Sequence, residues 1–154
     1  LPELAQKNVF LTVSGDGRSA EEYRFHPLFR DFLLRRLRSE IGREGIAAER
    51  TRIAQHFLDD GKWELALPYL LKAENFDLAA SVIAANGGEW VASGAFISLG
   101  SAIAQIPPAV LDAHPRALLH SAEAARLQGE SDRSAAALRR AAKLLHDAGD
   151  APGE

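Results

Sequence analysis

Residues that break helices divide most of this chain into short helical segments, and this pattern limits the fold more than any other feature. Beyond residue 43, apolar residues recur every three or four positions, which is the spacing of one helix face. The predicted helices cover residues 46–58, 65–73, 76–85, 96–106, 115–127 and 135–145, separated by Gly61, Asn86-Gly87-Gly88, Pro107-Pro108 and Gly129. Short connections favour antiparallel packing of successive helices. The sequence therefore predicts a mainly α fold, with helical hairpins over residues 44–154.

Two of the turns between these helices suggest an internal repeat. Gly61-Lys62-Trp63-Glu64-Leu65-Ala66 resembles the turn and second-helix entry of a tetratricopeptide repeat, and a second such turn begins at Gly129. The two glycines are 68 residues apart, which is twice the 34-residue period of this repeat class. The expected middle copy is weak, with only Gly94-Ala95 in place. Both a degenerate TPR-like α-solenoid and generic helical hairpins remain open. Pro68 inside a predicted helix should kink it or shift its start.

Segments with the residue types and alternation typical of β-strands occur only in the first part of the chain. Residues 9–13 are rich in β-branched and aromatic types, and residues 23–25 alternate again. The Gly15-Asp16-Gly17 stretch between them supplies turn residues, so we expect a β-hairpin over residues 9–25. A proline-initiated amphipathic helix should follow over residues 27–41. Hairpin and helix form a predicted first domain, residues 1–43, and the helical region 44–154 forms the second.

Composition excludes several classes of function. The net charge is −3, which indicates no general attraction to nucleic acid or membranes. The chain has no cysteine, so it holds no disulfide and no Cys-based zinc site. The five histidines lack metal-ligand spacing, and no nucleophile elbow or Lys-Ser/Thr phosphate loop is present. We therefore expect no catalytic residue, no metal, no membrane span and no enzymatic activity, and the absence of cysteine fits a cytoplasmic protein.

The stretch from Tyr23 to Leu33 is the most specific in the chain. It reads Tyr-Arg-Phe-His-Pro-Leu-Phe-Arg-Asp-Phe-Leu, so His26 stands where a strand should end and a helix begin. There it could serve as a helix-start or packing residue, or it could donate a hydrogen bond to a phosphate. The basic residues that follow wrap around the helix, which favours a solvated face over a DNA-binding stripe. They are Arg30, Arg35, Arg36, Arg38 and Arg43.

This stretch resembles the winged-helix module of the large bacterial LuxR-type regulators of the MalT-like family, which belong to the signal-transduction ATPases with numerous domains. The downstream order also resembles that family, with Ala54-Gln55-His56-Phe57, then Ile106-Pro107-Pro108, then His114-Pro115-Arg116-Ala117. The resemblance implies the end of a winged helix joined to the start of a TPR-like solenoid. The absence of methionine and the start at Leu1 add the expectation that the chain is part of a larger protein.

The resemblance also implies a function. Phe25-His26-Pro27-Leu28 is similar to the Met-His-Asp motif of related immune receptors, whose histidine contacts the β-phosphate of ADP. By this likeness His26 is the ADP phosphate sensor of the intact parent, although Pro27 departs from the motif. ATP or ADP would bind an upstream ATPase core, an effector would bind the solenoid, and DNA would be read by a separate downstream domain. Without these, the alternatives are a stand-alone TPR-like protein-binding adaptor and a winged-helix DNA binder.

Overall fold

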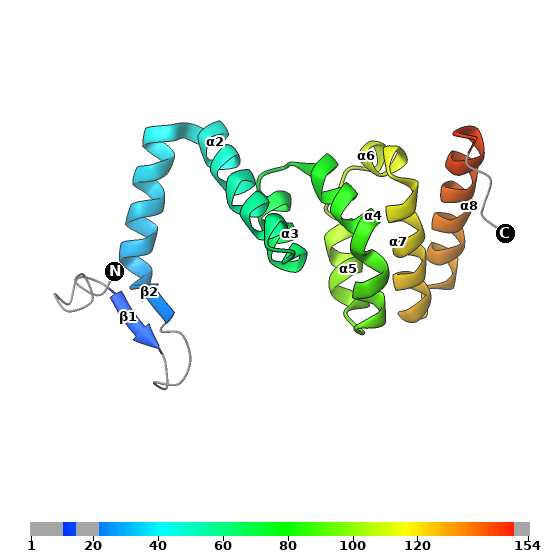
Figure 1. Ribbon diagram of the computed structural model, residues 1–154, viewed down its shortest axis with the longest axis horizontal. Helices are drawn as coiled ribbons and strands as arrows, with labels where there is room; N and C mark the ends of the chain where they lie inside the picture. Colours follow the sequence, from blue (N-terminus) through cyan, green and yellow to red (C-terminus); the bar gives the residue numbers. More distant parts are fainter. Residues whose placement is uncertain (1–10, 15–21, 150–154) are drawn as a thin grey trace. The chain divides into compact units, whose positions relative to one another are not determined.

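The computed structural model describes residues 11–14 and 22–149, and the described part is mainly helical (Figure 1). The chain forms two compact units, residues 1–46 and residues 47–154. The predicted domain boundary, after residue 43, lies close to the boundary between these units.

Unit 1 contains a pair of short strands followed by a helix. Strand β1 (Leu11–Ser14) pairs antiparallel with β2 (Glu22–Phe25), with Leu11 opposite Phe25 and Ser14 opposite Glu22. The remainder of the predicted hairpin, residues 9–10 and 15–21 with its glycine-containing loop, lies outside the described residues. Helix α2 (Pro27–Asp59) starts two residues after β2, with Pro27 as its first residue. That position suits proline, because the N–H it lacks would have no partner inside the helix.

Gly42 interrupts α2 and separates its two segments. Its φ of 67° and ψ of −174° are non-helical. Residues with a side chain rarely adopt a positive φ, so a glycine is needed here. The first segment therefore ends where the sequence predicted, at residue 41, and the second runs from residue 43 to Asp59.

Unit 2 stacks further helices on the end of α2. They are α3 (Trp63–Lys72), α4 (Phe76–Ala92), α5 (Phe96–Ile103), α6 (Pro108–Ala113), α7 (Pro115–Leu127) and α8 (Ser131–Asp147). Helix α3 packs on α4 and α5, α7 packs on both α4 and α5, and α8 packs on α7 (Figure 1). The core is built from leucine, isoleucine and many alanines, whose small side chains allow helices to approach closely. Its largest fully buried side chains are Leu67, Leu70, Ile83 and Leu99.

Four helices of unit 2 end in the same turn. One residue with positive φ follows each helix, and the next N–H then bonds to the carbonyl five residues earlier, which satisfies an otherwise free helix-end carbonyl. The positive-φ residues are Gly61, Glu74, Gly94 and Gly129, and the bonds are Lys62→Phe57, Asn75→Leu70, Ala95→Trp90 and Glu130→Ala125, at 2.8–3.2 Å. Gly61, Gly94 and Gly129 lie 33 and 35 residues apart. The weak middle copy in the sequence thus has the same turn as its neighbours.

The predicted end of the third helix, at residue 85, is wrong. Helix α4 continues through Gly87 and Gly88 to Ala92. Neither glycine has a positive φ. Gly87 faces the ring of His120 on α7, where an added Cβ would lie 2.5 Å from His120 Cδ2. This glycine therefore makes room for the contact between α4 and α7, and it does not end α4.

At two places, the helices that contain prolines differ from those predicted. Pro107-Pro108, expected to separate two helices, instead introduces the short helix α6, which the sequence analysis missed; Pro108 is its first residue. Helix α3 begins at Trp63 and continues through Pro68, so this proline neither starts nor ends the helix. It removes only the hydrogen bond that its missing N–H would have donated to the carbonyl of Glu64.

Candidate functional site

His26 lies at the junction between β2 and α2, as predicted. The backbone carbonyl of His26 accepts the first helical hydrogen bond, from the N–H of Arg30 at 2.9 Å. Its side chain is exposed. In the part of the chain that the structure describes, its imidazole has no hydrogen-bond or ion-pair partner. The backbone that carries the ring is fixed by the start of α2.

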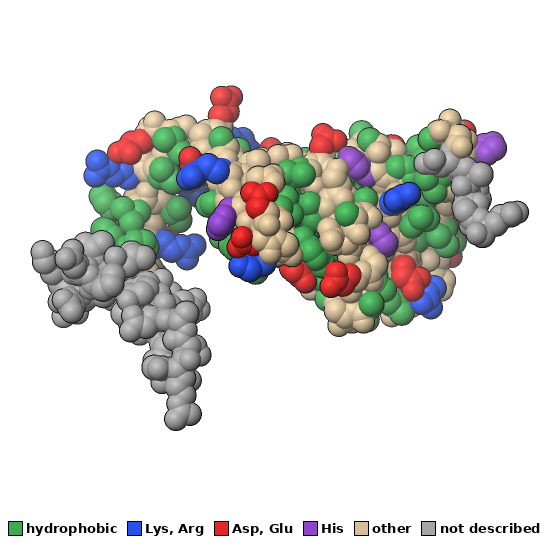
Figure 2. All heavy atoms as spheres, in the orientation of Figure 1, with side chains coloured by type: hydrophobic (Ala, Val, Ile, Leu, Met, Phe, Trp, Pro, Cys, Tyr) green, Lys and Arg blue, Asp and Glu red, His purple; other side chains and the backbone are tan. Residues whose placement is uncertain are grey.

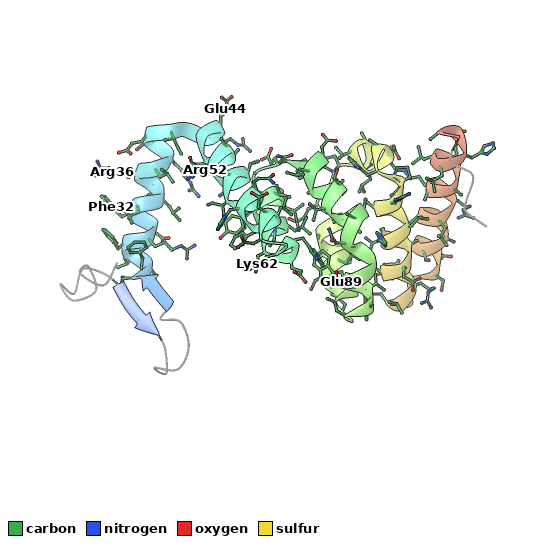
Figure 3. All side chains as sticks on the ribbon, viewed as in Figure 1. Phe32, Arg36, Glu44, Arg52, Lys62 and Glu89 are labelled. Atoms are coloured by element: carbon green, nitrogen blue, oxygen red, sulfur yellow. The ribbon has the colours of Figure 1, made fainter. Side chains whose placement is uncertain are left out.

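Aromatic rings hold this junction in place. The rings of Phe25 and Phe29 meet edge to face at 5.7 Å, and those of Phe29 and Phe32 stack at 6.3 Å. These contacts join the last residue of β2 to the first two turns of α2. Phe25, Leu28 and Phe32 nevertheless remain exposed. Figure 3 shows Phe32 and Arg36 one turn apart, both projecting away from the helix.

One arginine of this helix has an acidic partner on the same helix. Arg36 pairs with Glu40 one turn later, at 2.8 Å, and both side chains are largely exposed. An exposed pair of this kind contributes little to stability. Over unit 2, Figure 2 shows acidic and basic side chains interspersed on the face in view. The charge pattern therefore gives no particular support to a DNA-binding surface.

Two other histidines contribute to packing in unit 2. Nε2 of His120 lies 3.4 Å from the carbonyl oxygen of Ala84, with the ring seated over Gly87. Nε2 of His114 lies 3.5 Å from a carboxylate oxygen of Asp77. Both link α7 or its preceding turn to α4. Among the described residues, no three His, Asp or Glu side chains gather closely enough to bind a metal ion.

An open apolar groove of about 410 Å³ lies between α3, α4 and α5. Its volume falls within the ~300–1,000 Å³ common for small-ligand sites. Apolar side chains line most of it, namely Leu67, Pro68, Leu71, Trp90, Ile97 and Ala102. Glu64 and Lys72 line it from the first and last turns of α3, hydroxyl groups come from α5, and an amide group comes from Gln105 just after α5. Sequence reasoning missed this groove, because helical periodicity alone does not show which apolar residues stay uncovered between helices.

The perturbed pKa values belong to surface ion pairs outside both sites. A hydrogen bond from Arg140 lowers the pKa of Asp112, and one from Lys62 lowers the pKa of Asp60. Arg126 lowers the pKa of Glu123 in the same way. These ion pairs link side chains within helices, between helices and in turns, and none of them involves His26.

None of the described helices has the length and low polarity required to cross a membrane.

Comparison with protein families gives a match for the first unit. The family model of the MalT winged helix domain matches residues 1–45. No curated protein and no solved structure matches the chain. The match supports a MalT-like relationship for the segment that carries His26, and it ends close to the boundary between the two compact units.

Proposed function

We propose that this chain is a non-catalytic regulatory part of a signal-responsive, ATP-dependent transcriptional regulator. In this role it couples the nucleotide state of an ATPase core to an effector-sensing helical scaffold. The observation that carries the proposal is the match of residues 1–45 to the MalT winged helix domain. The exposed His26 at the strand-to-helix junction of that segment supports it.

His26 is the proposed sensor of bound ADP in the intact regulator. An imidazole N–H can donate a hydrogen bond to a phosphate oxygen, and bonds to charged acceptors are stronger than neutral ones. The fixed helix start and the aromatic contacts beside it would limit the motion of this donor. ATP or ADP would bind the ATPase core of the parent, and the chain itself supplies only this contact. No catalytic residue and no metal is assigned to it.

Unit 2 is the proposed effector-sensing scaffold, a TPR-like solenoid. In support, its positive-φ glycines recur 33 and 35 residues apart, close to the ~34-residue period of tetratricopeptide repeats. An effector that binds one state of the scaffold better would shift the equilibrium between the ADP and ATP states. DNA would be read by a separate LuxR-type domain, and the regulator would act in the cytoplasm.

The test of this proposal is ADP retention in the regulator that contains this chain together with its ATPase core. His26→Ala should weaken ADP binding roughly ten- to hundredfold, because a hydrogen bond to a charged group is lost. Basal transcription should rise. His146→Ala, which removes an exposed histidine from the last turn of α8, is the matched control and should leave both unchanged. Unchanged ADP affinity in His26→Ala would contradict the sensor role.

A protein-binding adaptor is the second candidate, favoured by the groove between α3 and α5. An adaptor would bind its partner through residues of unit 2 with the same affinity whether ATP, ADP or no nucleotide is present. If the reading frame around this chain encodes neither a phosphate-binding loop nor a helix-turn-helix, the adaptor becomes the better description.

A further inference from the structure

We infer that the groove between α3 and α5 binds a short, free, apolar peptide in extended conformation, with its amino terminus at Glu64 and its carboxylate at Lys72. The inference rests on the proposed function, for which it names the class of effector. Glu64 and Lys72 line the groove from the first and last turns of α3, with apolar side chains between them.

The two charged side chains of α3 are available to a ligand. In the described part of the chain, neither the Glu64 carboxylate nor the Lys72 ammonium has an ion-pair partner, and both residues are exposed. By contrast, Lys62 at the preceding turn is paired with Asp60 at 2.9 Å. The groove thus offers one negative and one positive group that the protein itself does not neutralise. A ligand with a cationic donor at one end and an anion at the other would complement the pair.

The spacing of the charges selects the length of the ligand. Glu64 and Lys72 are eight residues apart on one helix, which corresponds to ~12 Å along its axis. An extended peptide rises by ~3.3–3.6 Å per residue, so about four residues span this distance.

The lining between the charges selects apolar side chains. Pro68, Leu71, Trp90 and Ile97 line the groove, and Ile97 is 64% exposed. Covering such surface removes apolar area from water, which would provide most of the binding free energy. The terminal charges would then fix the direction of the peptide.

The experiment is a fluorescence titration of the 154-residue chain with the peptide Leu-Ala-Ala-Leu. Trp90 lines the groove, and its ring centroid lies 5.2 Å from that of Trp63, the other tryptophan of the chain. Intrinsic tryptophan fluorescence should therefore report occupancy of the groove. We expect a saturable change. Acetylating the amino terminus or amidating the carboxylate should each weaken binding about two- to fivefold, as expected for exposed ion pairs.

Variants assign each terminus to its partner. In Glu64→Gln, acetylation should no longer weaken binding, whereas amidation still should; in Lys72→Gln the pattern should be reversed. Glu89→Gln, at an exposed position of α4 (Figure 3), is the matched control and should behave as the native chain. Circular dichroism checks that each variant is folded.

Three results would overturn the inference: no saturable change, equal binding of free and blocked peptides, or unchanged discrimination in the Glu64 and Lys72 variants. The first two would leave the ADP-sensor role of His26 intact, because that role is measured by ADP retention in the regulator. Conversely, peptide binding with normal ADP affinity in His26→Ala would retain the groove and remove the sensor.

Discussion

Gly87 of α4 allows a bulky polar ring to sit in a helix interface. A Cβ at this position would lie 2.5 Å from Cδ2 and 2.6 Å from Cγ of His120, closer than real atoms approach. At the neighbouring Gly88, the nearest atom would be His120 Cε1 at an ordinary 3.6 Å. The two adjacent glycines thus share a helix and differ only in what they face.

Alanine at these two positions should have opposite effects on stability. Gly88→Ala should raise the free energy of unfolding by about 0.5–1 kcal/mol, because alanine is the better helix former. Gly87→Ala should lower it by about 1–3 kcal/mol, because the His120 ring must move. Urea denaturation measures both. His120→Ala should largely restore the Gly87→Ala variant, and a Gly87→Ala variant as stable as Gly88→Ala would contradict this packing.

The position of His26 between a strand and a helix could be predicted from sequence, whereas the packing of Gly87 against another helix could not. A histidine and a proline between a strand pattern and a helix pattern locate the junction without any tertiary information. The glycine pair at 87–88 matches a helix-stop signal equally well, because a local pattern does not contain His120, which is 33 residues away. The role of Gly87 is set by the contact between α4 and α7.

At the scale of elements, the short helix α6 is fastened to α8 by one side chain. Nε of Arg140 donates to Asp112 at 2.6 Å, and Nη2 donates to the carbonyl of Pro108 at 2.9 Å. The first bond lowers the pKa of Asp112. The sequence showed neither α6 nor this link, since two prolines in succession usually mark the end of a helix and the two partners are 28 residues apart.

The Asp112–Arg140 bond predicts a pH-dependent difference between the native chain and Asp112→Asn. Because the pKa of Asp112 is lower in the folded state, its contribution is fully present above its unfolded pKa and is lost as the pH falls through the folded value. The native chain should therefore melt at a higher temperature than Asp112→Asn above about pH 5, and the gap should narrow below about pH 4. Thermal melts from pH 3 to 7 test this, with Glu89→Gln as control. A gap that widens in acid would argue against the ion pair.

At the scale of the whole helical stack, burial changes from one end to the other. Leu70, Ile103 and Leu138 each lie nine residues after a positive-φ glycine, at Gly61, Gly94 and Gly129. Their exposed fractions are 0%, 3% and 48%. Helix α3 is covered by α4 and α5, and α5 by α7, whereas the corresponding side of α8 is open in the described part of the chain. Equivalent sequence positions thus have unequal surroundings.

Replacing the leucines at equivalent positions by alanine should lower the free energy of unfolding by different amounts. Leu70→Ala should cost about 2–5 kcal/mol of unfolding free energy, because it leaves a cavity in a closed core. Leu138→Ala should cost less than about 1 kcal/mol, since half of this side chain already contacts solvent. Urea denaturation at equal protein concentration provides the comparison. Equal losses would show that Leu138 is covered in solution.

The sequence predicted a mainly helical chain because breakers and periodicity are local signals. The break at Gly42 follows from the same kind of information, a glycine at the end of an apolar pattern. The groove could not be predicted, because its lining joins residues from three helices. The fate of Pro68 could not be predicted either, since one missing hydrogen bond decides little when the surrounding helix is held by buried Leu67 and Leu70.

The recurring turn also bears on how a chain of this kind can change length. Gly61-Lys62-Trp63 and Gly94-Ala95-Phe96 share a left-handed residue, a linking residue and an aromatic residue that starts the next helix. Loss of residues 62–94 would join Gly61 directly to Ala95 and recreate the same sequence of conformations without cutting a helix. Duplication of that segment would do the same. Evolution can therefore lengthen or shorten such a chain by whole hairpins, with the glycine turns as the natural points of exchange.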